Sequence, residues 1–196
     1  EVSLNTATFD IGDYYRINYQ QNFDISEDEE IKKVQELLLD SVERNLISDA
    51  PLGIALSGGV DSSSILSLAK KLDRTNQMHT FSIKLGESTF DESEYQQIMA
   101  NVAGSIHHEV LVSAGKIEEN MVAHLAYMDE PNANAASIPN WLLAKYSSQY
   151  VSVLLSGEGG DEIFNAYDTH LAYKIRQLYL RFTPDLARKF IYAFAH

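Results

Sequence analysis

The spacing of apolar positions changes several times along this chain. Ile31, Val34, Leu38 and Val42 recur at helical spacing, whereas residues 52–56 form a short, continuously apolar run that is typical of a strand buried on both faces. Further strands are predicted at 80–85, 108–112 and 150–155, and helices at 62–72, 91–104, 113–127 and from 137 onward. Strands that alternate with helices predict an α/β fold, with a parallel twisted sheet and helices on both faces.

Residues with helix-capping chemistry stand at several of these boundaries. Ser26 and Glu29 have the spacing of a capping box, in which each side chain bonds the backbone N–H of the other residue. Ser113 is placed to cap the helix that follows it, and Gly104 to end the preceding helix. Pro139 would stand in the first turn of its helix, where a missing N–H is tolerated.

These patterns divide the chain into three parts. Residues 1–25 are tyrosine-rich and irregular, and we expect an N-terminal arm or linker there. Residues 26–170 carry the strand–helix pattern, and residues 171–196 begin a helical C-terminal portion with a heavy apolar load. Because so much apolar surface seldom stays uncovered, and because the chain does not start with Met, we expect it to be cut from a longer protein.

Composition narrows the classes of protein to which this sequence can belong. The chain has 196 residues, 45% of them hydrophobic, which is enough for a domain with its own core. Its formal net charge of −13 would repel a phosphate backbone, so no nucleic-acid partner is expected. It contains no cysteine, which excludes disulfides, thiolate metal ligands and a cysteine nucleophile within these residues.

Targeting signals are also missing from the sequence. No apolar run approaches the roughly 20 residues that a membrane-spanning helix needs, so no membrane partner is expected. The first residues, EVSLNTATFD, lack the basic and apolar regions of a signal peptide. Cytoplasm is therefore the default expectation for localisation.

The strand at 52–56 runs into a glycine-rich loop, LSGGVDSSS, at residues 56–64. Glycines before a helix N-terminus let backbone N–H groups approach an anion, and the serines add hydroxyl donors. Asp61 would repel a phosphate unless a cation lay between them, and Mg²⁺ prefers a carboxylate together with phosphate oxygens. No lysine stands where a Walker A loop has one, which excludes a kinase or GTPase P-loop. The alternative is a plain turn with Asp61 or Ser62 as the N-cap.

A second glycine-rich turn, SGEGGDE at residues 156–162, follows the strand predicted at 150–155. Ligands of parallel α/β sheets bind beyond the carboxyl ends of the strands, which is where both loops would stand. The fold could therefore bring the two loops face to face, although they are far apart in the sequence. The alternative for Asp161 and Glu162 is a pair of acids that complement a helix dipole.

The first loop resembles the SGGxDS pyrophosphate loop of the ATP pyrophosphatases, which cleave ATP to AMP and pyrophosphate through adenylated intermediates. LSGEGGDEIF, at residues 155–164, is similar to a segment of the synthetase domain of class B, glutamine-dependent asparagine synthetases. SDAPLGIALSGGVDSS, HTFSIKL, FDESEY, HHEVLV and DEP also match, in the family's order, within residues 26–167. The resemblance implies a sheet of the adenine nucleotide alpha hydrolase-like, Rossmann-like kind.

The resemblance also implies roles for individual residues. The residues expected to hold the pyrophosphate part of ATP are Ser57, Gly58, Gly59, Asp61 and Ser62. The residues expected to contact the adenosine or AMP part are Leu56, Ile83, Ser156 and Gly157. Asp61 and Asp161 would hold Mg²⁺, and Glu158 would act in the amide-forming step.

The reaction implied is activation of a carboxylate, aspartate in the family, as an acyl-adenylate, with release of pyrophosphate and attack by ammonia. The expected partners are that carboxylate and ammonia, with a glutaminase domain in the full-length chain and a homodimer left open. Phe-Asn-Ala-Tyr at 164–167 departs from the family's Phe-Gly-Gly-Tyr, and DEPNANAASIP at 129–139 from DEPFADPSALP. A family lysine lies further downstream than this chain extends, and neither Lys174 nor Lys189 stands at a matching motif.

These departures leave two alternatives open. One is the same adenylation chemistry on another acceptor, of peptide, sugar or lactam type. The other is a nucleotide-binding module with impaired catalysis. A tRNA-modifying enzyme is disfavoured by the acidic charge and the lack of cysteine.

A few other residues could carry chemistry. His107 and His108 are neighbours on a predicted strand and would point to opposite faces, which favours structural roles over a metal pair. Glu109 and Glu130 are candidate acids of an acceptor pocket, and Trp141 is expected in the core.

Overall fold

The computed structural model describes residues 2–3, 8–9, 12–18, 24–74, 78–86, 92–130 and 133–183. By its internal contacts the chain divides into two units, Glu1–Leu38 and Leu39–His196. In the first unit, β1 (Val2–Ser3) pairs with β2 (Thr8–Phe9) in antiparallel fashion. Helix α1 (Glu27–Asn45) spans the boundary between the units.

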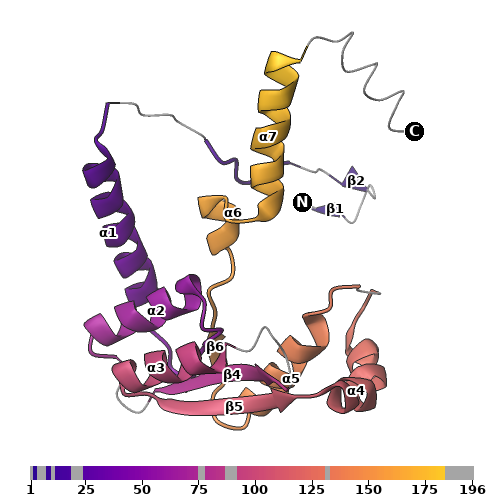
Figure 1. The fold of residues 1–196 in the computed structure, drawn as a ribbon. Coiled ribbons are helices and arrows are strands. Elements are labelled where there is room, and N and C mark those ends of the chain that lie inside the picture. The colour runs from indigo at the N-terminus through magenta and orange to yellow at the C-terminus, as the bar shows by residue number, and fades with distance from the viewer. Residues whose placement is uncertain are drawn as a thin grey trace. The chain divides into compact units, whose positions relative to one another are not determined.

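The second unit contains a four-stranded sheet in the order β5-β4-β3-β6 (Figure 1). Its strands are β3 (Leu52–Ala55), β4 (His79–Leu85), β5 (Ile106–Val112) and β6 (Val153–Leu155). All three pairings are parallel, which confirms the predicted α/β fold. The chain passes from β3 to β4 and β5 before it returns to the other side of β3, so the strand order reverses between β3 and β6. Such a reversal is the switch point at which open α/β sheets bind ligands.

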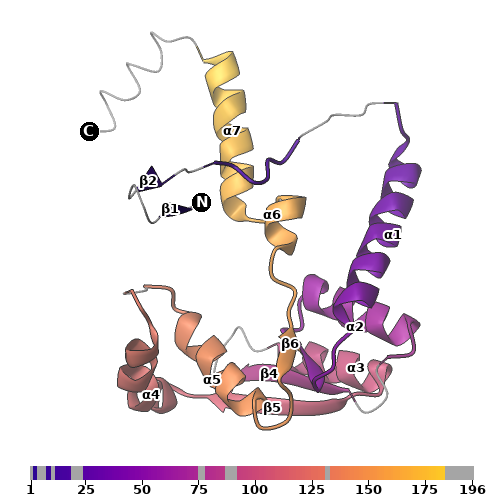
Figure 2. The same ribbon diagram turned by 180° about the vertical axis from the view of Figure 1, so that it is seen from behind.

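Helices cover both faces of the sheet. They are α2 (Val60–Lys71), α3 (Ser93–Ala103), α4 (Ala114–Tyr127) and α5 (Ser137–Ser147). Helices α2 and α3 lie side by side, as do α4 and α5 (Figure 1, Figure 2). One core packs Ile54 and Leu56 against α2 and α3, and the other packs Phe81 and Val110 against α5. Because successive side chains of a strand point to opposite faces, the sheet separates the two cores.

The predicted caps are confirmed where the structure describes them. The backbone N–H of Ser26 donates to Glu29 Oε2 at 3.0 Å, and the backbone N–H of Glu29 donates to Ser26 Oγ at 3.4 Å. Ser113 Oγ accepts from the backbone N–H of Lys116 at 3.3 Å, and Gly104 ends α3 in the left-handed conformation with φ 73°. Helix α3 has Glu92 as its N-cap, and the predicted start at residue 91 lies outside the described residues.

Strand β6 is shorter than the sequence predicts. The backbone N–H groups of Tyr150 and Val151 both donate to the carbonyl of Ser147 at 2.9 Å. These two residues therefore complete the turn that leaves α5, and the strand begins only at Val153. The apolar run of the sequence covers both the turn and the strand, so it could not separate them.

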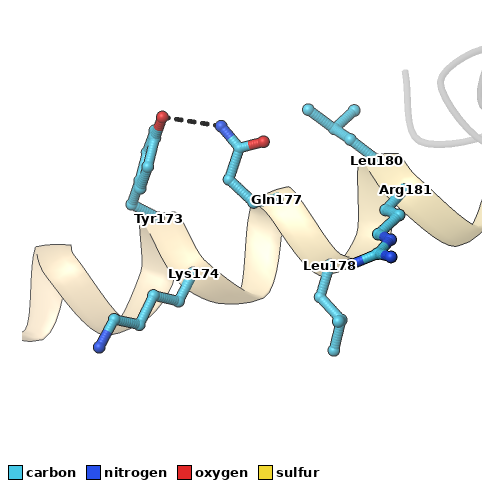
Figure 3. Close-up of a pocket in the computed structure, with 6 residues that line it drawn as sticks. All are labelled: Tyr173, Lys174, Gln177, Leu178, Leu180 and Arg181. Atoms are coloured by element: carbon cyan, nitrogen blue, oxygen red, sulfur yellow. Dashed lines mark hydrogen bonds between the residues drawn. The ribbon is translucent and has the colours of Figure 1, made fainter. Parts of the chain in front are cut away.

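The second unit continues with the short helix α6 (Gly160–Phe164) and with α7 (Asp168–Phe182). Helix α7 overlaps the start of the helical portion predicted at 171–196, of which residues 184–196 lie outside the described residues. A shallow hollow on α7 is lined by residues of this one helix: Tyr173, Lys174, Gln177, Leu178, Leu180 and Arg181 (Figure 3). Since a single helix forms it, the hollow is an open surface rather than an enclosed site. Over the ranges described, no helix is both long and apolar enough to cross a bilayer.

Candidate functional site

The first glycine-rich loop joins β3 to α2 and is held by hydrogen bonds among its own residues. Ser62 is buried, and its Oγ accepts from the backbone N–H of Ser57 at 3.1 Å and lies 2.9 Å from Ser57 Oγ. Ser57 Oγ in turn accepts from the backbone N–H of Gly59 at 3.2 Å. Gly58 has φ +91°, a conformation that residues with a Cβ rarely adopt. The loop is therefore a fixed turn that glycine makes possible.

Asp61 lies in the first turn of α2 rather than at its cap. The helix begins at Val60 and its N-cap is Gly59, so the alternative in which Asp61 or Ser62 caps the helix is wrong. The hydroxyl of Ser62 forms hydrogen bonds with the backbone N–H and the hydroxyl of Ser57, so it does not cap the helix. The N-cap is Gly59, which has no side chain to cap the first turn. A carboxylate in the first turn of a helix is stabilised by the helix dipole. That effect explains the position of Asp61 on α2, but it does not explain why a second loop packs against its carboxylate.

The second glycine-rich loop packs directly against Asp61. A Cβ built on Gly157 would lie 2.8 Å from the backbone N of Ser62 and 2.9 Å from Asp61 Cβ. A Cβ built on Gly160 would lie 2.6 Å from the carboxyl carbon of Asp61, and closer still to its Oδ2. Only residues without a Cβ allow this approach. The expectation that the two loops lie face to face is confirmed.

Asp161 follows Gly160 at the start of α6 and is half-buried. Its carbonyl accepts from the backbone N–H of Ala166 at 3.0 Å, so its backbone position is held by the turn after α6. Among the described residues, no three His, Asp or Glu side chains are grouped as the ligands of a metal ion. The second loop packs against Asp61, as described above. The candidate metal ligands in these loops are therefore the two carboxylates of Asp61 and Asp161.

Two of the residues predicted to contact adenosine, Leu56 and Ile83, pack their side chains into the two cores of the sheet. The side chain of Leu56 is 1% exposed in the core beneath α2, and its backbone N–H donates to the carbonyl of Phe81 at 2.7 Å. Ile83 packs against the other core. In the second loop, Ser156 and Glu158 are exposed and Gly157 is half-buried.

Gln96 of α3 also belongs to this site, and the sequence analysis missed it. Its Nε2 donates to the carbonyl of Ser57 at 3.0 Å, and its Cγ would lie 3.3 Å from a Cβ on Gly58. A signal was present in the sequence, because Gln96, Ala100 and Ala103 share the buried stripe of α3 and a glutamine is unusual at such a position.

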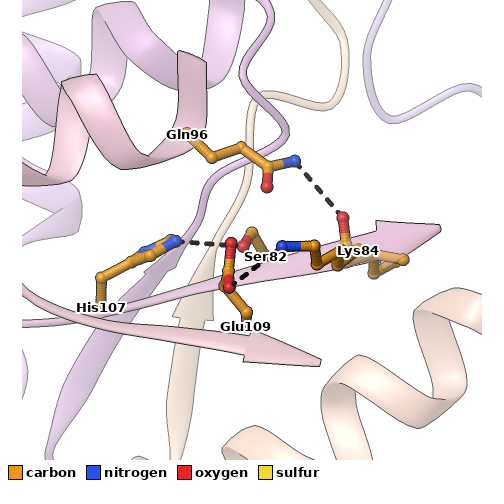
Figure 4. Close-up of polar contacts among 6 residues, drawn as sticks. Ser82, Lys84, Gln96, His107 and Glu109 are labelled. Atoms are coloured by element: carbon orange, nitrogen blue, oxygen red, sulfur yellow. Dashed lines mark hydrogen bonds and ion pairs between the residues drawn. The ribbon is translucent and has the colours of Figure 1, made fainter. Parts of the chain in front are cut away.

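His107 and His108 lie on β5 and point to opposite faces of the sheet, as the sequence predicts. His107 is within hydrogen-bond distance of Thr80 Oγ1 (3.0 Å) and Ser82 Oγ (3.2 Å), on the face that carries Gln96 (Figure 4). Burial lowers the pKa of His107, and the nearby Glu109 carboxylate opposes that shift. Within the described residues these contacts are structural, and no metal group forms around either histidine.

His108 lies among aromatic rings on the opposite face. Its Nε2 is 2.8 Å from Nδ1 of His79, and its ring stacks on Phe81 with centroids 4.9 Å apart. Burial lowers the pKa of His108, and His79 adds to that effect. A neutral imidazole suits this environment, because a charged ring would lose solvation there.

The candidate pocket acids differ in their surroundings. Glu109 Oε2, from the middle of β5, lies 3.7 Å from Nζ of Lys84, which is near the carboxyl end of β4 (Figure 4). Glu130 is exposed and stands beside residues 131–132, which lie outside the described residues. Neither acid is brought to the two glycine-rich loops by a contact that the structure records. Trp141 is half-buried and packs against His124 and Tyr127.

The turn between α6 and α7 contains one of the departures from the resembled family. Asn165 ends α6 in the left-handed conformation, with φ 56° and ψ 42°. Asparagine is one of the few residues besides glycine that adopt this conformation readily, so the replacement of glycine keeps the turn. Tyr167 OH donates to Glu162 Oε1 at 2.6 Å, which lowers the pKa of Glu162 and raises the pKa of Tyr167 to about 12.

The sequence matches the family described as asparagine synthase over residues 33–195. The chain belongs to this family. The chain is 32% identical over 157 residues to the glutamine-hydrolysing asparagine synthetase 1 of Bacillus subtilis (strain 168), and the match covers 80% of this chain and 24% of that protein. It is 32% identical over 151 residues to asparagine synthetase B of Escherichia coli (strain K12), and the match covers 69% of this chain and 27% of that protein. The chain therefore spans about a quarter of the length of these curated relatives.

Solved structures similar to this asparagine synthase chain include two NAD synthetases. One is a glutamine-dependent NAD⁺ synthetase from Acinetobacter baumannii in complex with adenosine diphosphate, with a TM-score of 0.48, 20% identity, and coverage of 76% of this chain and 29% of that chain. The other is an NH₃-dependent NAD synthetase from Campylobacter jejuni, with a TM-score of 0.46, 19% identity, and coverage of 69% and 60%.

Replacement of Gly157 by alanine tests the contact between the loops. Gly157→Ala should lower the free energy of unfolding by about 1–3 kcal/mol, because the added methyl group would overlap backbone atoms that cannot rotate away. Urea denaturation measures this loss. The matched control is Gly115→Ala in the first turn of α4, where the added Cβ would come no closer than 4.0 Å to Ser113 Oγ. A loss no larger than that of the control would contradict the close approach.

The hydrogen bond between Glu162 and Tyr167 predicts a pH effect. Tyr167→Phe should raise the pKa of Glu162 toward its ordinary value, because the phenol no longer stabilises the carboxylate. Since the folded-state pKa of Glu162 lies below its unfolded value, the stabilisation is present at neutral pH and is lost as the pH falls through the folded-state pKa. A carbon-detected NMR titration measures this pKa. Tyr173→Phe on α7 is the control, and a Glu162 pKa that responded equally to both changes would contradict the assignment.

Proposed function

We propose that this chain is the ATP-dependent, amide-forming domain of an asparagine synthase-family ligase. A substrate carboxylate attacks the α-phosphate of ATP, pyrophosphate leaves, and ammonia converts the acyl-adenylate into an amide with release of AMP. The observation that carries the proposal is the packing of Gly157 and Gly160 on Asp61, which joins the two glycine-rich loops at the switch point of the sheet. Membership of the family supports ATP-dependent amidation as the reaction class.

The first loop would hold the pyrophosphate part of ATP. The residues proposed for this role are Ser57, Gly58, Gly59, Asp61 and Ser62. The hydrogen bonds within the loop support the proposal, because they fix the turn from which the first N–H groups of α2 emerge. Donors that are fixed before the reaction stabilise the negative charge that builds on departing pyrophosphate, and they need no reorganisation to do so.

Asp61 and Asp161 would hold Mg²⁺. The donor chemistry fits, because both are carboxylates in the two apposed loops and the backbone of Gly160 lies against the Asp61 carboxylate. When bound, the ion would offset the charge of the triphosphate and polarise its oxygens. The protein's contribution is to carry the two carboxylates on two loops, which can approach each other because Gly157 and Gly160 have no Cβ.

The adenosine and AMP part would lie against Leu56, Ile83, Ser156 and Gly157. The support from the structure lies in the second loop, where Ser156 is exposed and Gly157 is half-buried. Glu158 is exposed in the turn before α6, where a carboxylate can accept the proton that ammonia loses as it forms the new C–N bond. Glu158 is thus the proposed general base of the second half-reaction.

The acceptor is aspartate by resemblance, and the segment at 129–139 supports a second candidate. That segment departs from the family pattern near the proposed acceptor pocket, which favours another carboxylate of peptide, sugar or lactam type. A screen for AMP release distinguishes the two acceptors. Aspartate with ammonia should release AMP and form asparagine, whereas AMP release with a different carboxylate only would support the second candidate.

A third candidate is a nucleotide-binding module with impaired catalysis. The departures at 129–139 and 164–167 motivate it, but the left-handed conformation of Asn165 argues that the second change preserves the turn. Such a module would bind Mg·ATP without exchanging pyrophosphate into ATP. The exchange assay on the full-length protein therefore distinguishes it from the ligase.

The whole protein is proposed to be a cytoplasmic, glutamine-dependent enzyme. The relatives named above are glutamine-hydrolysing, and the chain spans about a quarter of their length, which supports a glutaminase domain elsewhere in the protein. A homodimer is part of the same proposal. An upstream coding sequence that begins Met-Cys would support the glutaminase domain, because a cysteine freed at the N-terminus can act as its nucleophile.

Asp61→Asn tests the metal role. The change keeps the shape of the side chain but removes its charge, so ATP–pyrophosphate exchange should fall by roughly 10²–10³. Asp73→Asn is the matched control at the other end of α2, where Asp73 has φ 54° and asparagine is tolerated. Exchange that survives Asp61→Asn at the rate of the control would refute the assignment of Asp61.

Glu158→Gln tests the proton transfer separately. Exchange between ATP and pyrophosphate should stay unchanged, while amide formation should fall by about 10²–10⁴, because only the second half-reaction needs the base. Both rates are measured on the same preparation, with Glu119→Gln on the exposed face of α4 as the control. An equal loss in the two half-reactions would assign Glu158 to nucleotide binding instead.

A further inference from the structure

The carbonyls of Ser57 and Ile83 lie where β3 and β4 separate, and neither has a donor from a neighbouring strand of the described sheet there. The parallel pairing reaches Ala55 and Phe81, and the backbone N–H of Leu56 adds one more bond to the carbonyl of Phe81. Beyond that point β4 continues, while the chain turns away into the first loop at Ser57. The carbonyls of Ser57 and Ile83 therefore need hydrogen-bond donors from outside the sheet.

The side-chain amide of Gln96 supplies both donors. Its Nε2 donates to the carbonyl of Ser57 at 3.0 Å and to that of Ile83 at 3.4 Å. Gln96 is 3% exposed, and its Oε1 has no hydrogen-bond partner in the part of the chain that the structure describes. Burial of an amide costs free energy unless it is bonded, so the two bonds through Nε2 are what hold this side chain in place.

The first turn of α3 also supports the loop from behind. A Cβ on Gly58 would lie 3.1 Å from Glu92 Cβ, 3.2 Å from the Glu92 carbonyl and 3.3 Å from Gln96 Cγ. Gly58 thus has its left-handed backbone pressed against the helix that carries Gln96. The loop and the end of β4 are tied to the same point of α3.

We propose that Gln96 is a positioning residue of the nucleotide site. Its amide joins the pyrophosphate loop, through Ser57, to the strand that faces the adenosine, through Ile83, and so sets the distance between the two halves of the site. The inference rests on the nucleotide role proposed above. It predicts a particular failure when the amide is removed: a ligand that spans both halves loses more affinity than a ligand that occupies only one.

Gln96→Met, with Mg·ATP and Mg·pyrophosphate as the two ligands, tests this inference in the full-length protein. Because Oε1 has no partner among the described residues, methionine removes the Nε2 donor and little else. The Kd for Mg·ATP, measured by calorimetry, should rise about tenfold, while the Kd for Mg·pyrophosphate should rise less than about threefold. Gln97→Met is the matched control, because Gln97 is exposed and donates to Asn101 Oδ1 within the same helix. The control should bind both ligands as the unchanged protein does.

Gln96→Glu keeps the inference testable even when Gln96→Met fails to fold. A carboxyl group at this position can donate to a carbonyl only when it is protonated. Even then its single O–H can replace only one of the two bonds that Nε2 makes. Gln96→Glu should therefore bind Mg·ATP more weakly than the unchanged protein at every pH, and the loss should be largest where the carboxyl is charged. A Gln96→Glu variant that binds Mg·ATP as tightly as the unchanged protein across the pH range would overturn the inference.

The outcomes separate the two proposals. Gln96 variants that fold and bind Mg·ATP as tightly as the unchanged protein would overturn the role of Gln96 alone. The same holds for equal losses with Mg·ATP and Mg·pyrophosphate, because those would indicate a general effect on folding. An unchanged protein that binds neither ligand would refute the proposed function, and the role of Gln96 with it.

Discussion

The approach of the second loop to the carboxylate of Asp61 is the constraint on which the rest of the arrangement depends. It requires β6 to lie beside β3, so after β5 the chain must cross back over the sheet and add β6 on the side of β3 opposite β4. It also requires two positions without a Cβ, Gly157 and Gly160, at the point of contact. The contact therefore depends both on the strand order, which places the two loops at neighbouring strand ends, and on the two glycines, which let the loops touch. Neither alone would bring the loops together.

One face of strand β4 carries apolar side chains and the other carries polar ones. On β4, Phe81, Ile83 and Leu85 pack into an apolar core, whereas Thr80 and Ser82 face His107 of β5 in a buried polar row. Paired hydroxyl and imidazole groups satisfy one another there, which lets a polar face be buried without a large loss of free energy. Gln96 lies over the same face of the sheet (Figure 4), and its amide donates to Ser57 of the first loop.

Much of the fold could be predicted because strands, helices and caps depend on neighbours in the sequence. The parallel sheet, the box of Ser26 and Glu29, and the meeting of the two loops all follow from local patterns and a rule about strand ends. The bonds of Gln96 to Ser57 and to Ile83 could not be predicted, because they depend on where separate segments come to lie. Asn165 is a third case, because its left-handed conformation is rare for a residue with a Cβ and could not be predicted from the residue type.

The separation of the two cores by the sheet has an evolutionary consequence. The loops proposed to bind ATP are supported by α2 and α3 on one face, whereas residues 129–139 join α4 to α5, which packs on the other face. On the function proposed above, drift in that connection would alter which molecule is amidated and leave the proposed ATP-binding loops undisturbed. A lineage built on this domain would then acquire new acceptors by changing one side of the sheet and keeping the other.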